Sequence, residues 1–257
     1  MTRTAWQLTD RNALVTGGSR GIGRAIAAVL LALGAHVTVV ARDPDELAAA
    51  VRALGERAAG VAGDVTSAAD RARIAEAVAA RGPLHVLVHN AGTNVRAPLV
   101  RYDDATIERL LALNLTAPLL LSRALHPSLA AARGAAVIHV GSVAGQLALP
   151  TGVAYAAAKA GLAQAARTLA LEWARDGIRV NAVAPWYTRT PLVEPVLARP
   201  DALAAILART PLGRIAEPAE VAAVVAFLAL PAASYVTGQC IAVDGGMSIQ
   251  GLPALTD

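Results

Sequence analysis

The stretch LVTGGSRGIG, residues 14–23, decides the fold. Its first three residues are an apolar run typical of a strand, and a helical pattern runs from Ile22 to Leu33 and closes at Gly34. Between the two, glycines let a pyrophosphate approach the backbone N–H groups at the start of the helix. The sequence therefore predicts a strand, a phosphate-binding turn and a helix, the first unit of a dinucleotide-binding domain.

Apolar runs and helical patterns alternate outward from this unit to the end of the chain. We expect further strands at 37–41, near Val61, and at 84–88, 136–140, 178–183 and 240–243. We expect helices at 45–54, 70–80, 104–129, 155–174 and 218–230. This alternation predicts an α/β fold, a doubly wound, Rossmann-type parallel sheet of seven strands with helices on both faces. We expect a single domain over residues 1–257, in which the irregular stretch 185–218 forms a mobile substrate lid.

Composition excludes several classes of protein. The 257 residues are 55% hydrophobic and 16% charged, so the chain is not intrinsically disordered. The 23 basic residues include a single lysine, but a net charge of +4 is too small to favour nucleic-acid binding. The charge-free stretches 25–41 and 134–158 contain glycine, histidine and hydroxyl side chains, which suits buried elements rather than a membrane span. Cys240 is the only cysteine and residues 1–11 contain no apolar signal segment, so we expect a cytoplasmic protein without disulfides.

Tyr155 and Lys159 form the most informative pair of polar residues. They are four apart on a predicted helix, so they share one face and the ammonium lies near the phenol. A nearby cation favours the phenolate and brings the pKa of the phenol toward the working pH, which suits an acid/base. Lys159 is the single lysine, and a compact ammonium contacts a phenol and a ribose hydroxyl better than a planar guanidinium does. Simple core packing of this tyrosine is the weaker alternative.

Two further polar residues lie where chemistry is expected. Ser142 follows the strand at 136–140, at the edge where open α/β sheets bind ligands, so its hydroxyl is placed to hold a substrate carbonyl. A serine that only turns the chain is the alternative. Asn114 interrupts an apolar helical stretch, where it needs a buried partner or else marks a kink near Pro118.

The end of the second strand indicates the cofactor. An NAD-selective site places a carboxylate there, whereas this chain has Ala41 followed by Arg42. Arg20 in the glycine turn offers a second guanidinium, and two arginines suit the dianionic 2′-phosphate of NADP(H). Either arginine is alternatively an ordinary solvated residue. We therefore predict NADP(H), and no metal, because no cluster has ligand spacing.

The ordered motifs resemble those of the short-chain dehydrogenases/reductases over nearly the whole chain. After residues 16–23 they are Asn90-Ala91-Gly92, Asn114, Ser142, Tyr155-x-x-x-Lys159 and Asn181 to Pro185. Residues 210–214 (TPLGR) and 231–239 (PAASYVTGQ) look most like the tropinone-reductase-like branch. The resemblance implies hydride transfer between a nicotinamide and a carbonyl or alcohol, a water-linked proton relay from Asn114 through Lys159, and a homotetramer. We expect its interface at the helix 219–230 and the last strand.

The resemblance also assigns binding roles. Asp64 and Val65 correspond to the adenine site, with Asp64 accepting from the exocyclic amine, and Thr188 and Thr190 to the carboxamide site. The residues expected at the cofactor are Gly17, Ser19, Arg20, Gly21, Ile22, Gly23, Arg42, Asp64, Val65, Asn90, Ala91, Gly92, Tyr155, Lys159, Pro185, Thr188 and Thr190.

Two residues depart from the family pattern. His89 stands where the family usually has asparagine, and we expect it to replace a brace between strands rather than to act on substrate. Trp186 stands where a glycine is usual, which puts the Thr188 contact in doubt. The expected substrate pocket is mostly apolar and consists of Ser142, Ala144, Gln146, Leu147, Tyr155, Trp186, Tyr187 and Leu192.

These residues predict an oxidoreductase that transfers hydride between NADP(H) and a neutral, partly hydrophobic ketone or secondary alcohol. Ser142, Tyr155, Lys159 and Asn114 are the expected catalytic residues. A 3-oxoacyl-[acyl-carrier-protein] reductase is an alternative, because three arginines near the mouth of the expected substrate pocket could bind an acidic carrier: Arg96, Arg101 and Arg189. A sugar or polyol dehydrogenase is a further alternative. A non-catalytic NADP-binding regulator is the alternative from a different class, although a regulator has no use for the full catalytic set. We expect no nucleic-acid or membrane partner.

Overall fold

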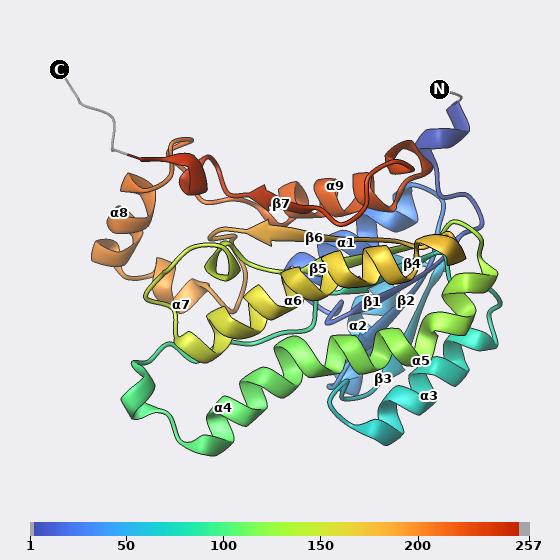
Figure 1. Ribbon diagram of the computed structural model, residues 1–257, viewed down its shortest axis with the longest axis horizontal. Helices are drawn as coiled ribbons and strands as arrows, with labels where there is room; N and C mark the ends of the chain where they lie inside the picture. The colour runs from blue at the N-terminus through green and yellow to red at the C-terminus, as the bar shows by residue number, and fades with distance from the viewer. Residues whose placement is uncertain (1–2, 252–257) are drawn as a thin grey trace.

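The computed structural model describes residues 3–251 and shows a parallel sheet of seven strands between two layers of helices (Figure 1). The strands are β1 (Asn12–Thr16), β2 (His36–Ala41), β3 (Ala58–Ala62), β4 (Val86–His89), β5 (Ala136–Val140), β6 (Arg179–Pro185) and β7 (Cys240–Val243). The helices are α1 (Gly21–Ala32), α2 (Pro44–Leu54), α3 (Ala68–Ala79), α4 (Asp104–Leu111), α5 (Ala117–Ala131), α6 (Val153–Glu172), α7 (Glu194–Leu197), α8 (Pro200–Ala208) and α9 (Pro218–Ala229). The predicted doubly wound α/β class is confirmed, in one Rossmann-like domain.

The strand order, β3-β2-β1-β4-β5-β6-β7, places the two halves of the sheet on either side of the β1–β4 pair. Thr16, the last residue of β1, lies opposite Val40 of β2 and His89 of β4. The loops that follow β1 and β4 therefore leave the sheet side by side at its topological switch point, where open α/β sheets bind ligands.

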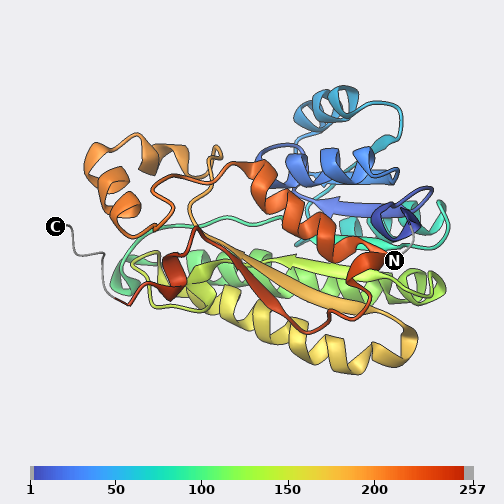
Figure 2. The same cartoon turned by 90° about the horizontal axis from the view of Figure 1, so that it is seen from above.

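Both faces of the sheet are covered (Figure 2). In β4, Val86 and Val88 pack in the core that includes residues of α1, α2 and α9, whereas Leu87 packs in the core with α3, α5 and α6. Burial of alternate residues on both sides explains why the strands read as continuous apolar runs. Within residues 3–251, no helix combines the length and apolar character needed to cross a membrane.

The predicted continuous helix at 104–129 is wrong in one respect. A five-residue π-helix, Ala112–Thr116, separates α4 from α5, and Asn114 lies in its middle. The Asn114 side-chain amide donates to Leu110 O at 2.9 Å and to Thr93 O at 3.0 Å. Wide turns of this kind often lie at functional sites. Here the turn ends two residues before Pro118, whose nitrogen cannot donate a helical hydrogen bond.

Residues 185–218, expected to be the least regular stretch of the chain, are helical in part. The segment contains α7 and α8, and each helix carries a proline in its first turn, Pro195 and Pro200. Proline at this position starts a helix because its missing N–H has no partner there in any case. The two helices lie beyond the end of β6 and pack around Leu197 and Ile206 (Figure 1).

Candidate functional site

The glycine turn after β1 is closed against the loop after β4. The Asn90 side-chain amide donates to Gly17 O at 2.8 Å and to Thr16 O at 3.1 Å. Gly17 has φ +64°, and a Cβ built there would lie 2.8 Å from the Cα of Ala91. A Cβ on Gly23 would lie 2.2 Å from Gly17 O. Both positions therefore require glycine, and the turn and the predicted Asn90-Ala91 segment form one unit.

Tyr155 and Lys159 extend from α6 toward the end of β5. Lys159 is 4% exposed, its Nζ donates to Val140 O at 3.0 Å, and it lies 5.6 Å from the centroid of the Tyr155 ring. Burial lowers the pKa of Lys159 from 10.5 to about 8. Burial also raises the pKa of Tyr155 above its usual value, while the Ser142 hydroxyl and the charge of Arg96 lower it. The expected lowering of the tyrosine pKa by Lys159 is thus not the dominant effect in the protein alone.

Ser142 lies one residue after Gly141, at the C-terminal end of β5, as predicted. Its Oγ accepts a hydrogen bond from Ala144 N at 3.2 Å, which holds the start of the short 3-10 turn Val143–Gly145. It also lies close enough to Tyr155 to act on its pKa as a hydrogen-bond partner. The hydroxyl therefore serves both the chain turn and the phenol.

Asn114 and Lys159 meet at Gly92. A Cβ on Gly92 would lie 2.8 Å from Asn114 Oδ1 and 3.5 Å from Lys159 Nζ. Asn114 is fully buried, and its Oδ1 has no hydrogen-bond partner within residues 3–251. The structure thus brings together the ends of the expected relay and leaves a buried acceptor beside the ammonium.

His89 forms part of a buried pair of imidazoles on the neighbouring strands β4 and β5. Its ring stacks on His139 of β5 with centroids 5.0 Å apart, and its Nε2 lies 2.7 Å from Ser122 Oγ of α5. His139 is fully buried, and neither of its ring nitrogens has a partner in the described part of the chain. Burial lowers the pKa of His89 well below 6.5 and that of His139 to about 3, so both rings are neutral at pH 7. These contacts are those of the brace between strands that we expected of His89.

The residues expected near the adenosine lie around α2 and the end of β3. Ser19 Oγ donates to Glu46 Oε1 at 2.8 Å, and Arg20 Nη1 lies 3.6 Å from Glu46 Oε2. Arg42 is exposed after β2. One guanidinium of the expected pair therefore has a carboxylate partner.

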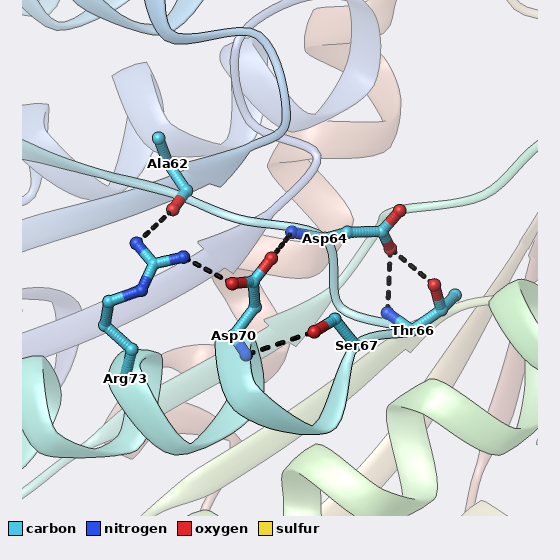
Figure 3. Close-up of polar contacts among 6 residues, drawn as sticks. All are labelled: Ala62, Asp64, Thr66, Ser67, Asp70 and Arg73. Carbon is cyan, nitrogen blue, oxygen red and sulfur yellow. Dashed lines mark hydrogen bonds and ion pairs between the residues drawn. The ribbon is translucent and has the colours of Figure 1, made fainter.

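Asp64 lies in a network after β3 (Figure 3). Its Oδ1 accepts from Thr66 N at 2.8 Å and from Thr66 Oγ1 at 2.7 Å, while its own N–H donates to Asp70 Oδ2 at 2.7 Å. Arg73 pairs with Asp70 in turn and donates to Ala62 O. The second oxygen of Asp64 points away from Thr66, and this oxygen is the one left for an adenine amine (Figure 3).

The segment after β6 approaches the glycine turn and the small helices. Thr190 lies against Gly21, where a Cβ would be 3.2 Å from Thr190 Cγ2. Thr188 is 2% exposed and its hydroxyl donates to Trp186 O at 3.1 Å, which uses the proton that a carboxamide oxygen would need. The Thr190 position fits the expected cofactor contact better than the Thr188 position does.

The expected substrate residues do not all share one surface. Trp186 Nε1 donates to Thr210 Oγ1 at 3.1 Å, and its ring meets Tyr187 edge to face at 4.6 Å. Both aromatic rings line a cleft of about 440 Å³ with residues 210–212 and 242–246, and Ser142 is not among the residues that line it. On the Ser142 side, Gln146 Nε2 contacts Cys240 Sγ at 3.2 Å.

Sequence reasoning missed two residues at this site and the position of a third. Glu46 lies 27 positions from Ser19, and its contact is set by the packing of α2 beside the glycine turn. His139 reads as one residue of a buried strand, and only the register β4–β5 places it against His89. Arg96 was named as a mouth residue, but its closeness to Tyr155 depends on the path of the 93–98 loop.

Residues 17–248 match the family described as enoyl-(acyl carrier protein) reductase. The chain belongs to the short-chain dehydrogenase/reductase family. A tropinone reductase homologue of Arabidopsis thaliana is 44% identical over 251 residues, which cover 96% of this chain and 95% of the relative. A solved structure described as a gluconate dehydrogenase from Agrobacterium tumefaciens has a TM-score of 0.93 at 35% identity, covering 97% and 100% of the two chains. A gluconate 5-dehydrogenase from Burkholderia cenocepacia, solved with NADP and tartrate, has a TM-score of 0.91 at 31% identity, covering 96% and 98%.

These relatives confirm the family and the tropinone-reductase-like resemblance. The protein is therefore an oxidoreductase of the CH–OH/C=O type, and the similar Burkholderia cenocepacia enzyme was solved with NADP. The described residues fit a nicotinamide cofactor: Gly17 and Gly23 allow the close packing of the glycine turn at the start of α1, and the unpartnered Asn114 Oδ1 and the Lys159 ammonium both lie beside Gly92.

Proposed function

We propose that this protein is an NADP(H)-dependent carbonyl reductase or alcohol dehydrogenase for a neutral, partly hydrophobic ketone or secondary alcohol. The observation that carries the proposal is the meeting of Tyr155, Ser142 and Lys159 at the end of β5, next to Gly92. When bound, the nicotinamide supplies or accepts the hydride.

Tyr155 is the proton donor in carbonyl reduction. Its raised pKa keeps the phenol protonated at pH 7, and the Ser142 hydroxyl orients the carbonyl oxygen toward it. Lys159, with a pKa of about 8, carries its charge at pH 7 and stabilises the phenolate that proton transfer leaves behind. Asn114 holds water beside Lys159 and returns a proton through it. Thr190, Asn90 and the glycine turn position the cofactor, while Arg20 and Arg42 recognise its 2′-phosphate.

The decisive experiment follows absorbance at 340 nm with NADPH and then NADH, using cyclic ketones, aryl ketones and acetoacetyl thioesters. We expect oxidation of NADPH with a cyclic or aryl ketone. Preferred turnover of the thioesters would instead support the 3-oxoacyl-carrier-protein reductase. Binding of NADPH without any turnover would support the regulator, and better use of NADH would contradict the proposed cofactor.

A second candidate function is oxidation of a sugar acid or polyol. The gluconate dehydrogenases among the similar structures favour it, as does Arg96, an exposed cation that acts on the pKa of Tyr155. Such a cation pairs with a substrate carboxylate. Gluconate oxidation with NADP⁺ that falls in the Arg96→Gln variant, with cyclic ketone reduction unaffected, would support this candidate over the first.

The lid, the assembly and the location complete the proposal. The segment 185–218, with α7 and α8, covers the substrate, the chain forms a homotetramer through α9 and β7, and the enzyme acts in the cytoplasm. Light scattering during size-exclusion chromatography tests the assembly, for which a mass near 26.1 kDa would contradict the tetramer.

A further inference from the structure

Glu46 contacts two residues that are expected to bind the cofactor, Ser19 and Arg20. Its carboxylate accepts from the Ser19 hydroxyl at 2.8 Å and lies 3.6 Å from the Arg20 guanidinium. Ser19 and Arg20 both belong to the glycine turn, and Arg20 is one of the two proposed partners of the 2′-phosphate. The Glu46 carboxylate therefore already binds the Ser19 hydroxyl and lies beside the Arg20 guanidinium, the groups that we expect to bind the phosphates of the cofactor.

Glu46 is the better fixed member of this ion pair. It lies in the first turn of α2, and its backbone N–H donates to the N-cap Asp43 Oδ1 at 3.0 Å. An acidic side chain there is also stabilised by the helix dipole. Its side chain is 35% exposed, against 67% for Arg20. Arg20 can therefore turn toward a ligand, whereas the carboxylate stays beside the turn.

A fixed carboxylate at this place affects the two cofactors differently. The 2′-phosphate of NADP(H) is a dianion, so Glu46 repels it and competes with it for Arg20. The 2′-hydroxyl of NAD(H) carries no charge and is itself a hydrogen-bond donor, which a carboxylate accepts. The same side chain thus weakens the binding of NADP(H) and is compatible with the binding of NAD(H).

We propose that Glu46 is a specificity-determining residue that narrows the preference for NADP(H) over NAD(H) set by Arg20 and Arg42. This inference rests on the proposed use of NADP(H). It predicts that the selectivity rises when the Glu46 charge is removed with its shape retained.

The test measures binding of fragments and so does not depend on turnover. Adenosine 2′,5′-bisphosphate and 5′-AMP, which differ by the 2′-phosphate, are titrated by calorimetry into the wild type, Glu46→Gln and Glu56→Gln. Glu56 lies just beyond α2 and is exposed, so its variant makes the same change in net charge away from the turn. The glutamine at position 46 still offers an oxygen to Ser19 and Arg20, which preserves the local packing.

We expect Glu46→Gln to bind the bisphosphate about five- to tenfold more tightly, and 5′-AMP within about twofold of the wild type, as removal of a nearby like charge predicts. Glu56→Gln should change neither. The gain should shrink in high salt, because both charges are partly exposed. Unchanged or weaker bisphosphate binding by Glu46→Gln would overturn the inference, as would an equal gain in Glu56→Gln.

Failure of the inference is distinguishable from failure of the proposed cofactor. If the wild type binds 5′-AMP as tightly as the bisphosphate and Glu46→Gln restores the difference, Glu46 sets selectivity and the proposed NADP(H) preference is wrong. If the wild type prefers the bisphosphate and Glu46→Gln leaves that preference unchanged, the cofactor stands and the role of Glu46 is wrong.

Discussion

The two ends of the proposed cofactor site use charge in opposite ways. At the catalytic end, Lys159 is 4% exposed and its Nζ is held by a backbone carbonyl. At the adenosine end, Arg20 is 67% exposed and faces Glu46 across 3.6 Å. In the buried region one cation acts without screening by water, and burial shifts its pKa. In the exposed region the net effect depends on several charges together, and salt weakens the interaction of each of them. In the proposed site, the residues for the chemistry are therefore buried and those for the choice of cofactor are exposed.

The strongest test of the buried end is Tyr155→Phe. The change removes the proton donor and keeps the ring, so we expect kcat to fall about 10³-fold, within the range for loss of a general acid. Absorbance at 340 nm gives the rate, and the Kd for NADPH serves as the control because it should change little. Retention of a tenth or more of the rate would refute the role of Tyr155.

Lys159→Met tests whether burial of the ammonium carries a cost in stability. With a folded pKa of about 8 against 10.5, the folded state binds fewer protons than the unfolded state between these values, so the wild type gains stability as pH rises. From pH 8 to 10 we expect its unfolding free energy to rise by about 2–3 kcal/mol relative to the variant. Urea unfolding at several pH values measures the free energy of unfolding of both proteins. If the two free energies change with pH in parallel, the lysine is not buried as described.

His139→Phe tests the second buried group in the acid range. The unfolded imidazole takes up a proton below pH 6.5, whereas the folded pKa is about 3, so the wild type loses stability as pH falls. At pH 4.5 we expect the phenylalanine variant to be more stable by about 2–3 kcal/mol from this effect. Thermal melts at pH 7 and 4.5 give the comparison, and a variant that is less stable at both would show that the His139 nitrogens have partners.

Arg42→Gln gives the smallest expected effect, at the exposed end. Loss of one guanidinium should weaken the binding of NADPH about tenfold, which is the scale of one charge-assisted contact, and should leave the affinity for NADH nearly unchanged. Fluorescence titration of both cofactors measures the two Kd values. A similar loss for NADH would show that Arg42 does not contact the 2′-phosphate.

The sequence is sufficient for the architecture because local patterns dictate it. The run before Gly17 and the helix after it, repeated along the chain, permit one class of sheet, and the spacing of Tyr155 and Lys159 defines a shared helix face. The position of Ser142 after β5 follows from the same pattern.

The remaining features depend on contacts between distant segments. Asn114 in an apolar helix indicates a local departure, but the π-helix follows from its bonds to Leu110 O and Thr93 O. Prolines in 185–218 read as breaks, although two of them start helices. The Glu46 contact with Ser19 has no trace in local spacing, because packing of α2 against the glycine turn creates it.

The wide turn at Ala112–Thr116 has a consequence for insertions and deletions. A π-helical turn holds one residue more than the α-helical turn it replaces, and each residue of an α-helix turns the chain by about 100°. Deletion of one residue here would allow a single regular helix with α4 and α5 in phase, but it would remove the wide turn that carries Asn114. The amide beside Gly92 would then point elsewhere, so chain length in this segment is constrained even where side-chain identity is not.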